Sequence, residues 1–216
     1  MTGMSSKTAR PITGIARLVV AATLLVALIY QIVDKIANND LEPSTYYTLF
    51  TIESTMIAIV VVAIGGMLAM RHPVDPVGYT AVRVAVTSYA IMTAVVYNVL
   101  LRGLPPEGYV GPQWPGEIMH VWFPIYITLD WLFAPGRPRL GWRALLVVIV
   151  YPILWLAFTL VRGSVDGWYP YPFLNPESGW GSVLVYILVI TGFVVGVATL
   201  LIAYSRWRGR AITSAS

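Results

Sequence analysis

Long apolar runs dominate the pattern along the chain, and short polar stretches separate them. The runs cover residues 15–36, 45–70, 79–101, 117–132, 142–161 and 181–205. A helix needs about 20 consecutive apolar residues to cross the hydrocarbon core of a bilayer, and only helices and closed barrels satisfy their backbone hydrogen bonds there. The pattern therefore predicts an all-α membrane protein, a bundle of six transmembrane helices.

The composition supports this prediction and leaves little chain for anything else. Hydrophobic residues make up 57% of the 216 residues and charged residues only 11%, whereas a soluble domain carries about 25% charged residues. The first run is too long for the apolar core of a signal peptide and lacks a small-residue cleavage site. Because only short connections remain between the runs, we expect residues 1–216 to form a single domain.

The basic residues divide unevenly between the two sides of a six-helix arrangement. Eleven fall on one side: Lys7, Arg10, Arg17, Arg71, Arg83, Arg137, Arg139, Arg143, Arg206, Arg208 and Arg210. Three fall on the other: Lys35, Arg102 and Arg162. Since positive residues concentrate on the cytoplasmic side of membrane proteins, we expect both termini to be cytoplasmic. This asymmetry accounts for the net charge of +4, so we expect no nucleic-acid partner.

Several kinds of chemistry are excluded by missing residues and motifs. The chain has no cysteine, which rules out disulfides, thiol catalysis and cysteine-ligated metals. It also lacks the Gly-x-Ser-x-Gly nucleophile elbow, the His-Glu-x-x-His zinc helix and the phosphate-binding loop of soluble enzymes. We therefore expect neither a metal nor a cofactor.

A small group of polar residues lies near matching edges of different apolar runs. His120 stands at the start of the fourth run, Thr51 and Glu53 near the start of the second, and Tyr97 and Asn98 near the end of the third. With a rise of 1.5 Å per residue, all five lie within one or two helical turns of the same depth. Polar residues inside membrane segments are candidate functional residues, so a site here depends on which of them face one another.

The helical rotation separates Thr51 from Glu53. Four hydroxyl residues recur at spacings of three and four and form one polar stripe: Thr48, Thr51, Ser54 and Thr55. Glu53 is rotated by about 200° from Thr51. If Thr51 faces His120, Glu53 is expected to meet a different neighbour, such as the first or third helix. Glu117 precedes His120 by three residues and could orient its ring, as a carboxylate does in nucleophile and base arrangements.

Structural explanations also exist for these residues. A threonine in a membrane helix usually bonds the carbonyl one turn back, and a histidine near the interface is often half solvated. Asp130 lies close to Arg137, Arg139 and Arg143, so an ion pair with one of them is favoured over catalysis. The residues alone support a six-helix protein with a possible Thr/His site open to the outer leaflet.

The connection between the fifth and sixth runs has an unusual composition. It contains Trp168, Tyr169 and Tyr171, with prolines at positions 170 and 172. Alternating prolines forbid helix and favour an extended backbone, so we expect this segment to run extended across the outer mouth of the bundle. Such aromatic residues form an interfacial belt in most membrane proteins, and the proline spacing favours an additional role in covering the site.

Three motifs resemble those of one family. They are Leu49-Phe50-Thr51-Ile52-Glu53-Ser54, Met119-His120 followed by Pro124, and Trp168-Tyr169-Pro170-Tyr171-Pro172-Phe173-Leu174. In these motifs and in helix number the chain resembles the androgen-induced membrane hydrolase family over nearly its whole length, and most of all a bacterial branch of that family. The resemblance implies a multi-pass protein of a bacterial plasma membrane.

The resemblance also implies an activity. Family members are threonine hydrolases that cleave fatty acid esters of hydroxy fatty acids within the membrane. Carried over, the nucleophile falls on Thr51 and the base on His120, with Thr48 as an alternative nucleophile. His120 would take the Thr51 proton, the alkoxide would attack a lipid ester carbonyl, and water would release the acyl-enzyme. The expected supporting residues are Glu53, Asn98, Glu117, Trp168, Tyr169 and Tyr171, with Asn98 or a backbone amide near Gly116 as the oxyanion donor.

Two other classes of function remain open. A non-enzymatic membrane scaffold or regulator would leave Thr51 and His120 far apart or unpaired. A proton-coupled transporter would line a continuous polar path from Glu53 to Asp130. The distance between Thr51 and His120, and a lipid-shaped cavity beside them, would distinguish the hydrolase from both.

Overall fold

The computed structural model describes residues 6–105 and 108–213, and all of the regular structure in these ranges is helical. The elements in chain order are α1 (Ser6–Ala37), α2 (Pro43–Tyr46), α3 (Phe50–Arg71), α4 (Val77–Val96), the π-helical turn η1 (Tyr97–Leu101), α5 (Trp114–Glu117), the π-helical turn η2 (Ile118–Trp122), α6 (Phe123–Phe133), α7 (Ala144–Asp166), the 3₁₀ turns η3 (Pro172–Leu174) and η4 (Pro176–Ser178), and α8 (Trp180–Thr213). The expected all-α class is therefore confirmed.

Five helices within the described ranges are long and apolar enough to cross a membrane. They are Ala9–Ala37, Phe50–Arg71, Val77–Leu101, Ala144–Asp166 and Trp180–Trp207, and they match the first, second, third, fifth and sixth predicted runs. The fourth run is also helical, but it consists of α5, η2 and α6 in succession. It is shorter than the other five and contains both a histidine and two acidic residues. By length and composition it is therefore not among the candidate spans.

The second helix begins later than the apolar run predicts. The run starts at residue 45, whereas α3 starts at Phe50. Leu49 has an extended backbone (φ −66°, ψ 128°), which separates α3 from the short helix α2 and the turn that follows it. Thr51 is therefore the second residue of α3 and not a residue two turns inside a longer helix.

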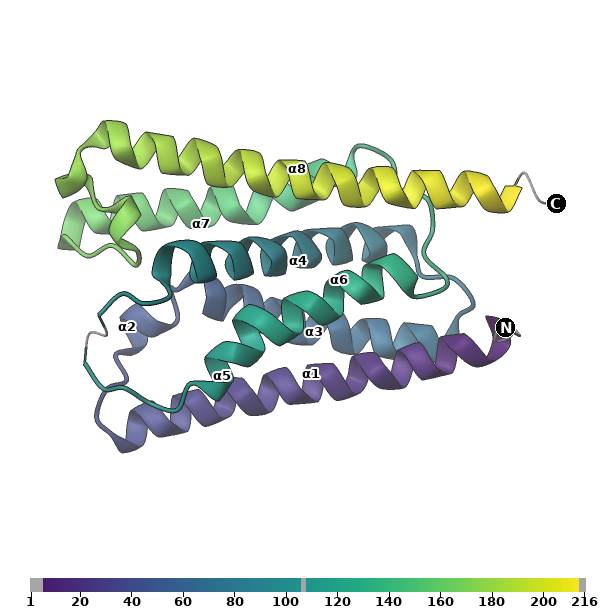
Figure 1. Ribbon diagram of the computed structural model, residues 1–216, viewed down its shortest axis with the longest axis horizontal. Coiled ribbons are helices and arrows are strands. Elements are labelled where there is room, and N and C mark those ends of the chain that lie inside the picture. Colours follow the sequence, from purple (N-terminus) through teal and green to yellow (C-terminus); the bar gives the residue numbers. More distant parts are fainter. Residues whose placement is uncertain (1–5, 106–107, 214–216) are drawn as a thin grey trace.

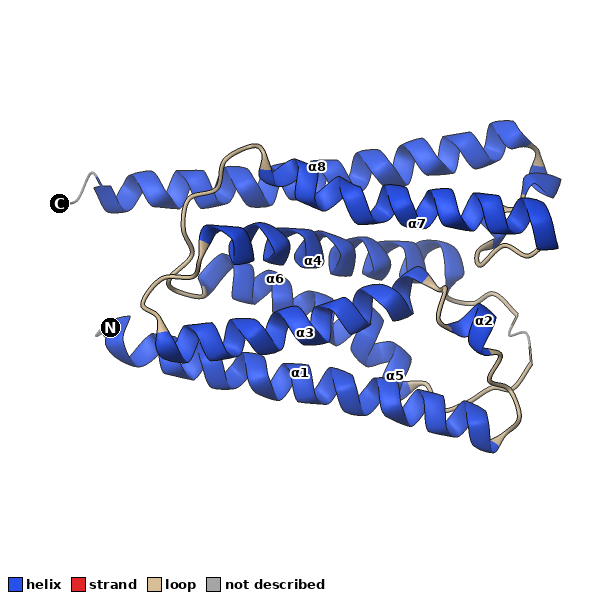
Figure 2. Cartoon of the chain, turned by 180° about the vertical axis from the view of Figure 1, so that it is seen from behind, coloured by secondary structure: helices blue, strands red, loops and turns tan. Residues whose placement is uncertain are grey.

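The helices form a bundle in which α1 begins and α8 ends at the same end (Figure 1). α1 packs along α3, α4 contacts α3, α6, α7 and α8, and α7 pairs with α8. The view from behind shows α1 and α3 on one side of α4 and the α7–α8 pair on the other (Figure 2). We call the end where α1 begins and α8 ends the terminal end. The opposite end, which holds α2 and the η1 turn, is the distal end.

Close contact between α1 and α3 depends on two glycines. A Cβ atom built on Gly14 would lie 2.8 Å from the Gly66 carbonyl oxygen, and one built on Gly66 would lie 2.9 Å from the Gly14 carbonyl oxygen. Small residues let membrane helices approach until their backbones touch. A side chain at either position would push the two helices apart.

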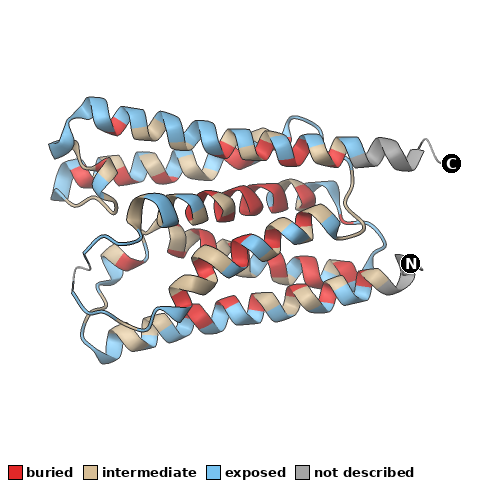
Figure 3. Ribbon diagram, viewed as in Figure 1, coloured by how far each residue is buried: buried red, intermediate tan, exposed pale blue. Residues whose placement is uncertain are grey.

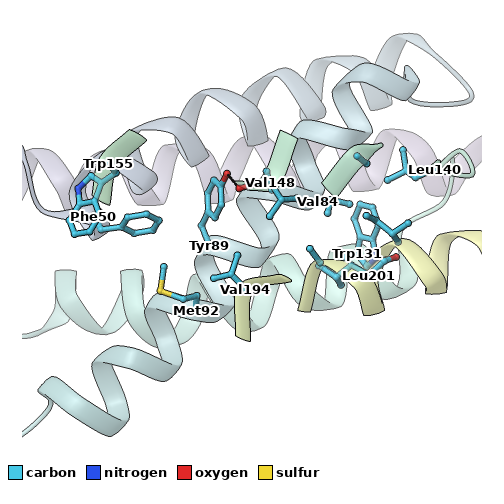
Figure 4. Close-up of a cluster of buried hydrophobic side chains, with 14 of the residues drawn as sticks. Phe50, Val84, Tyr89, Met92, Trp131, Leu140, Val148, Trp155, Val194 and Leu201 are labelled. Atoms are coloured by element: carbon cyan, nitrogen blue, oxygen red, sulfur yellow. Dashed lines mark hydrogen bonds between the residues drawn. The ribbon is translucent and has the colours of Figure 1, made fainter. Parts of the chain in front are cut away.

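α4 lies between two hydrophobic clusters, and Figure 3 shows it as the most continuously buried helix. One cluster packs α4 against α7 and α8, and the other packs it against α1, α3 and α6. Within the first cluster, the Tyr89 hydroxyl donates to the Val148 carbonyl oxygen at 2.7 Å (Figure 4). That carbonyl lacks its usual partner, because the residue four positions later is Pro152, which has no N–H. A side chain from α4 thus satisfies a backbone group that a proline leaves open in α7.

A buried ionic network joins the helices at the terminal end. Asp75, in the α3–α4 connection, accepts from Arg10 at 2.7 Å and lies 3.5 Å from Arg17 and 3.6 Å from Arg83. Asp130 on α6 pairs with Arg17 at 3.1 Å and also with Arg83. All five side chains are at most 7% exposed. A buried charge must be paired to be tolerated, and each carboxylate here meets at least two guanidinium groups.

The expected partners of Asp130 were wrong. Asp130 pairs with Arg17 of α1 and Arg83 of α4 and not with the sequence neighbours Arg137, Arg139 or Arg143. Arg137 lies instead over the rings of Trp131 and Tyr204, 4.8 and 5.0 Å from their centroids. The reason is that Asp130 faces the interior of the bundle, where residues distant in sequence are nearer than those in the following loop.

Candidate active site

Thr51 and His120 face each other at the distal end. The distance from His120 Nε2 to Thr51 Oγ1 is 3.4 Å, and His120 Nδ1 lies 2.9 Å from the Gly116 carbonyl oxygen. A carbonyl can only accept, so Nδ1 carries the ring hydrogen and Nε2 presents its lone pair to the threonine hydroxyl. The expected proximity of the two side chains is confirmed. Catalytic contacts of this length often shorten when substrate binds.

Two π-helical turns carry the aromatic groups of the site. His120 lies in η2 and Tyr97 begins η1, and their rings stack with centroids 3.9 Å apart and an interplanar angle of 16°. In a π-helical turn the backbone amides bond five residues back instead of four, as the Arg102 amide does to the Tyr97 carbonyl oxygen and the Phe123 amide to the Ile118 carbonyl oxygen. The two turns therefore hold the imidazole between a ring face and a backbone acceptor.

Asn98 supports the backbone at His120. Its side-chain nitrogen donates to the carbonyl oxygens of Ala94 at 2.8 Å and His120 at 3.3 Å. Because both contacts use the amide donor, Asn98 is a link between η1 and η2 and not the oxyanion donor suggested by its depth.

Glu117 and Glu53 have partners that the sequence did not indicate. Glu117 Oε1 accepts from Arg102 at 2.6 Å. The expected role of Glu117, orienting the His120 ring, belongs instead to the Gly116 carbonyl oxygen. Glu53 Oε2 accepts from the Tyr151 hydroxyl of α7 at 3.1 Å. Glu53 is separated from the Thr51 face, as expected. Its neighbour is α7, however, and not the first or third predicted run, which correspond to α1 and to α4 with η1.

Thr51 lies in the first turn of α3, where the backbone amides have no partner four residues back. The first such bond of the helix runs from the Glu53 amide to the Leu49 carbonyl oxygen at 3.1 Å. The Tyr171 hydroxyl interacts with the Thr51 side chain and with the backbone amides of Phe50 and Thr51. Burial raises the pKa of this phenol above its ordinary value, so it stays protonated at neutral pH. The nucleophile candidate thus sits among amide and hydroxyl donors at the positive end of a helix.

Thr48, the alternative nucleophile, has a different environment. Its hydroxyl lies 3.1 Å from the Ser44 carbonyl oxygen and 2.9 Å from the Thr45 carbonyl oxygen. It also accepts from Arg162 Nη1 at 3.0 Å. These contacts are those of a structural hydroxyl at the end of α2, and they place no base beside it. The geometry favours Thr51 over Thr48.

The aromatic segment after α7 reaches the site through one residue. Trp168 lies under Arg162, whose guanidinium is 4.4 Å from the ring centroid, and Tyr169 packs against Gly163. Tyr171 stacks on Phe173 with centroids 5.2 Å apart and contacts Thr51. The expectation of an extended segment was wrong in part, because η3 and η4 follow Tyr171. Proline at the first position of a 3₁₀ turn favours this compact geometry.

Two cavities meet at Thr51. One has a volume of about 310 Å³ and lies between α4, α7 and α8, lined almost wholly by apolar side chains. Four of its lining residues are labelled in Figure 4: Phe50, Met92, Trp155 and Val194. The other has a volume of about 300 Å³ and contains His120 together with polar residues of the α1–α3 connection. Both are lined by Thr51, Tyr97, Leu101 and Tyr171, which therefore form the wall between them.

In residues 6–105 and 108–213, no group of three or more histidine, aspartate and glutamate side chains could hold a metal ion. The sequence pointed to Thr51 and His120 by depth, but it gave no role to the Tyr97 ring or to the amides of Phe50 and Thr51. Neither a π-helical turn nor a helix break at Leu49 has a strong sequence signal.

Comparisons with protein-family models, curated proteins and solved structures find no match to this chain. A functional interpretation therefore rests on two things, the geometry of the site and the motif resemblance.

Proposed function

We propose that the protein is an intramembrane lipid-ester hydrolase with Thr51 as nucleophile and His120 as general base. The observation that carries the proposal is the His120 ring, whose Nδ1 is held by Gly116 while Nε2 lies 3.4 Å from the Thr51 hydroxyl. An apolar cavity of about 310 Å³ adjoins that hydroxyl, which suits a fatty-acyl substrate. The resemblance to the androgen-induced membrane hydrolase family points to the same two residues.

The proposed reaction proceeds through an acyl-enzyme. His120 Nε2 takes the Thr51 proton as Oγ1 attacks the ester carbonyl carbon, and the carbonyl electron pair moves to its oxygen. The ester C–O bond then breaks, and His120 returns the proton to the departing alcohol oxygen. Water attacks the acyl-threonine with His120 again as base, which releases the fatty acid and restores Thr51.

The oxyanion donors in this proposal come from α3 and the aromatic segment. The Tyr171 hydroxyl interacts with the Thr51 side chain and with the amides of Phe50 and Thr51, so all three donors lie near the proposed nucleophile. Donors fixed before the reaction stabilise a developing negative charge without reorganisation, and the partial positive charge of the α3 N-terminus adds to them. These groups replace Asn98 as the proposed donors.

The two other classes of function have less support. A scaffold has no need for a histidine lone pair directed at a hydroxyl between two cavities. A proton-coupled transporter needs a polar path from Glu53 to Asp130, but neither residue lines the two cavities at Thr51. Asp130 is instead bound by Arg17 and Arg83.

Substitution of the two residues tests the hydrolase proposal. In detergent or in vesicles, Thr51→Ala and His120→Ala should each lower ester hydrolysis by about 10⁴-fold or more, and the double variant should be scarcely worse because the two act as a unit. A fluorophosphonate probe should label the wild type and Thr48→Ala but not Thr51→Ala. Labelling retained in Thr51→Ala would reject Thr51 as the nucleophile, and a wild type that neither hydrolyses esters nor reacts with the probe would favour a scaffold.

The proposal includes a topology of six spans with cytoplasmic termini. The first and last helices reach the same end of the bundle (Figure 1), which supports an even number of crossings, and in this proposal the α5–η2–α6 segment is the sixth. The basic residues divide eleven to three in favour of the terminal side, as expected for the cytoplasmic side. The site then opens toward the outer leaflet of a bacterial plasma membrane.

Cysteine labelling tests this topology, because the chain has no cysteine of its own. Ser178→Cys, in the α7–α8 connection, should react with an impermeant thiol reagent applied to intact cells. Ser5→Cys and Ser216→Cys should react only after the cells are opened. Terminal labelling in intact cells would reverse the orientation.

A further inference from the structure

The two cavities that meet at Thr51 differ in chemistry. The apolar cavity is lined by side chains from three helices: Val96 of α4, Ile149 and Leu156 of α7, and Ile187 and Val194 of α8. Its lining includes few residues with polar groups, among them Thr51, Thr93 and Thr191. A cavity of this size is at the small end of ligand sites, which span about 300–1,000 Å³. It fits one hydrocarbon chain better than two.

The polar cavity carries an excess of negative charge. Its lining includes Lys35, in the last turn of α1, and Asp40 and Glu42 of the connection between α1 and α3. Lys35 is paired with Asp40, so the Glu42 carboxylate has no matching cation on this wall. Hydrogen bonds from Lys35 and from the Tyr109 amide hold the pKa of Asp40 below its ordinary value, so this carboxyl is ionised at neutral pH. A second negative charge brought into this cavity would be repelled.

The reacting groups divide between the two cavities. Thr51 lines both, whereas His120 lines only the polar one. His120 is the group that protonates the departing alcohol and activates the water, so both must lie on its side of the wall. The acyl chain must then lie on the other side, and it remains there while it is attached to Thr51.

We propose that the substrate is an ester of a single fatty acid with a small polar alcohol that is neutral or cationic. The acyl chain occupies the apolar cavity between α4, α7 and α8, and the alcohol occupies the polar cavity beside Lys35, Asp40 and Glu42. This inference rests on the proposed hydrolase function and specifies its substrate class. In the reaction, the alcohol leaves and water enters through the polar cavity, and the products are the fatty acid and the alcohol.

The same division disfavours esters of hydroxy fatty acids. In such an ester the departing alcohol carries a second hydrocarbon chain and a carboxylate. The chain would displace water from a polar cavity, and the carboxylate would approach Asp40 and Glu42. Both effects raise the activation barrier for hydrolysis relative to an ester of a small uncharged alcohol. The substrate class inferred from the cavities therefore differs from the one that the family resemblance implies.

A substrate panel with one acyl group and varied alcohols tests the polar side. The purified protein should hydrolyse monooctanoylglycerol and octanoylcholine about 10-fold faster, in kcat/KM, than the octanoyl ester of glycolic acid, because a unit charge repelled by about 1.4 kcal/mol slows the reaction by that factor. The octanoyl ester of hydroxystearic acid should be the slowest. Glu42→Lys should reduce the discrimination against glycolate, while Glu177→Lys, in another distal connection, should leave it unchanged.

A second pair of variants tests the acyl side. Thr191 and Val189 are both exposed residues of α8, but only Thr191 lines the apolar cavity. Thr191→Trp should fill the cavity and lower hydrolysis of octanoyl esters much more than that of acetyl esters of the same alcohols. Val189→Trp adds the same side chain to the outer surface and should affect neither series.

The outcomes separate the two proposals. If the wild type cleaves esters through Thr51 but prefers the glycolate or hydroxystearate ester, the substrate class is wrong and the hydrolase proposal stands. Equal loss of octanoyl and acetyl turnover in Thr191→Trp would overturn the assignment of the acyl chain to the apolar cavity. If the wild type cleaves no ester of the panel and Thr51 reacts with no probe, the hydrolase proposal fails and the substrate inference fails with it.

Discussion

The two ends of the bundle both place polar side chains in an apolar environment, but they do so in opposite ways. At the terminal end, Asp75 and Asp130 are each bound by two or more arginines, and neither carboxylate lines the cavities at Thr51. At the distal end, the Thr51 hydroxyl and His120 Nε2 face each other across 3.4 Å with a cavity on either side. Carboxylates that are each bound by several arginines hold helices together, whereas a hydroxyl and a ring nitrogen beside open space are available for chemistry.

The terminal network is also unequal in charge. Three arginines meet two aspartates, and Arg17 Nη2 and Arg83 Nη1 are buried without a hydrogen-bond partner among the described residues. Such a cluster has little capacity to lose another acceptor, since an unpaired buried charge costs several kcal/mol. The comparison therefore predicts that substitutions at the terminal end act on stability and those at the distal end act on turnover.

The largest effect on stability is expected at Asp130. Asp130→Ala leaves Arg17 and Arg83 short of an acceptor and should lower the free energy of unfolding by about 3–5 kcal/mol. Denaturation in mixed detergent micelles, followed by tryptophan fluorescence, measures this change. Asp166→Ala removes the exposed partner of Arg162 and should have a far smaller effect. Similar losses in both variants would contradict the structural role of the terminal network.

At the distal end, removal of one hydroxyl should lower turnover and leave the fold intact. Tyr171→Phe keeps the ring stacked on Phe173 but removes the group that contacts Thr51, so kcat should fall by about 10²-fold with little change in KM. Tyr169→Phe is the matched control and should retain activity. A thermal midpoint that falls in Tyr171→Phe while kcat stays constant would make this residue an anchor only.

Between the two ends, Tyr89→Phe tests whether a side chain substitutes for a missing backbone donor. The variant leaves the Val148 carbonyl without its partner and should cost about 1–3 kcal/mol. Pro152→Ala restores an N–H one turn after Val148, so Tyr89→Phe should cost less in that background. A double-mutant cycle of unfolding free energies measures the coupling, and additive effects would show that the proline and the tyrosine act independently.

The smallest effect concerns pH and the distal loop. The pKa of Asp40 is lowered by the hydrogen bond from Lys35 and then by the Tyr109 amide, so its contribution to stability is present above the unfolded pKa of about 3.9. It is lost as the pH falls through the folded value. The difference in unfolding midpoint between the wild type and Asp40→Asn should therefore shrink below about pH 4. In Lys35→Gln protein the difference should be smaller at every pH, and a difference that grows with acidification would reverse the assignment.

The sequence predicted depth well and neighbours poorly. Counting residues from the ends of apolar runs brought Thr51 and His120 to one level, because a helix rises by a fixed amount per residue. The same count gives the direction of a side chain on its own helix but not which helix lies opposite. Glu53 was therefore separated correctly from Thr51, yet its partner Tyr151 depended on the packing of α7, which a single helix cannot specify.

Local competition explains the remaining differences. Glu117 precedes His120 by three residues, which is close enough for its carboxylate to orient the ring. Arg102, which follows η1, binds that carboxylate instead of His120. The helix break at Leu49 falls in a segment of hydroxyl and aromatic residues that carries no glycine or proline after Pro43. The usual signals of a helix boundary are thus missing where the first turn of α3 supplies its free amides.

In the two π-helical turns, the number of residues matters as much as their identity. Each ordinary helical residue turns the chain by about 100°, and a π-helical turn accommodates one residue more than the regular helix would. Deleting a single residue such as Val121 from η2 would let the helix return to regular geometry, with the part that precedes the deletion rotated by about 100° relative to α6. His120 would then keep its neighbours in sequence but lose Thr51. Relatives of this protein should accordingly be compared by the spacing between His120 and Pro124 before they are compared by identity, since a one-residue gap there separates an assembled pair from two unrelated side chains.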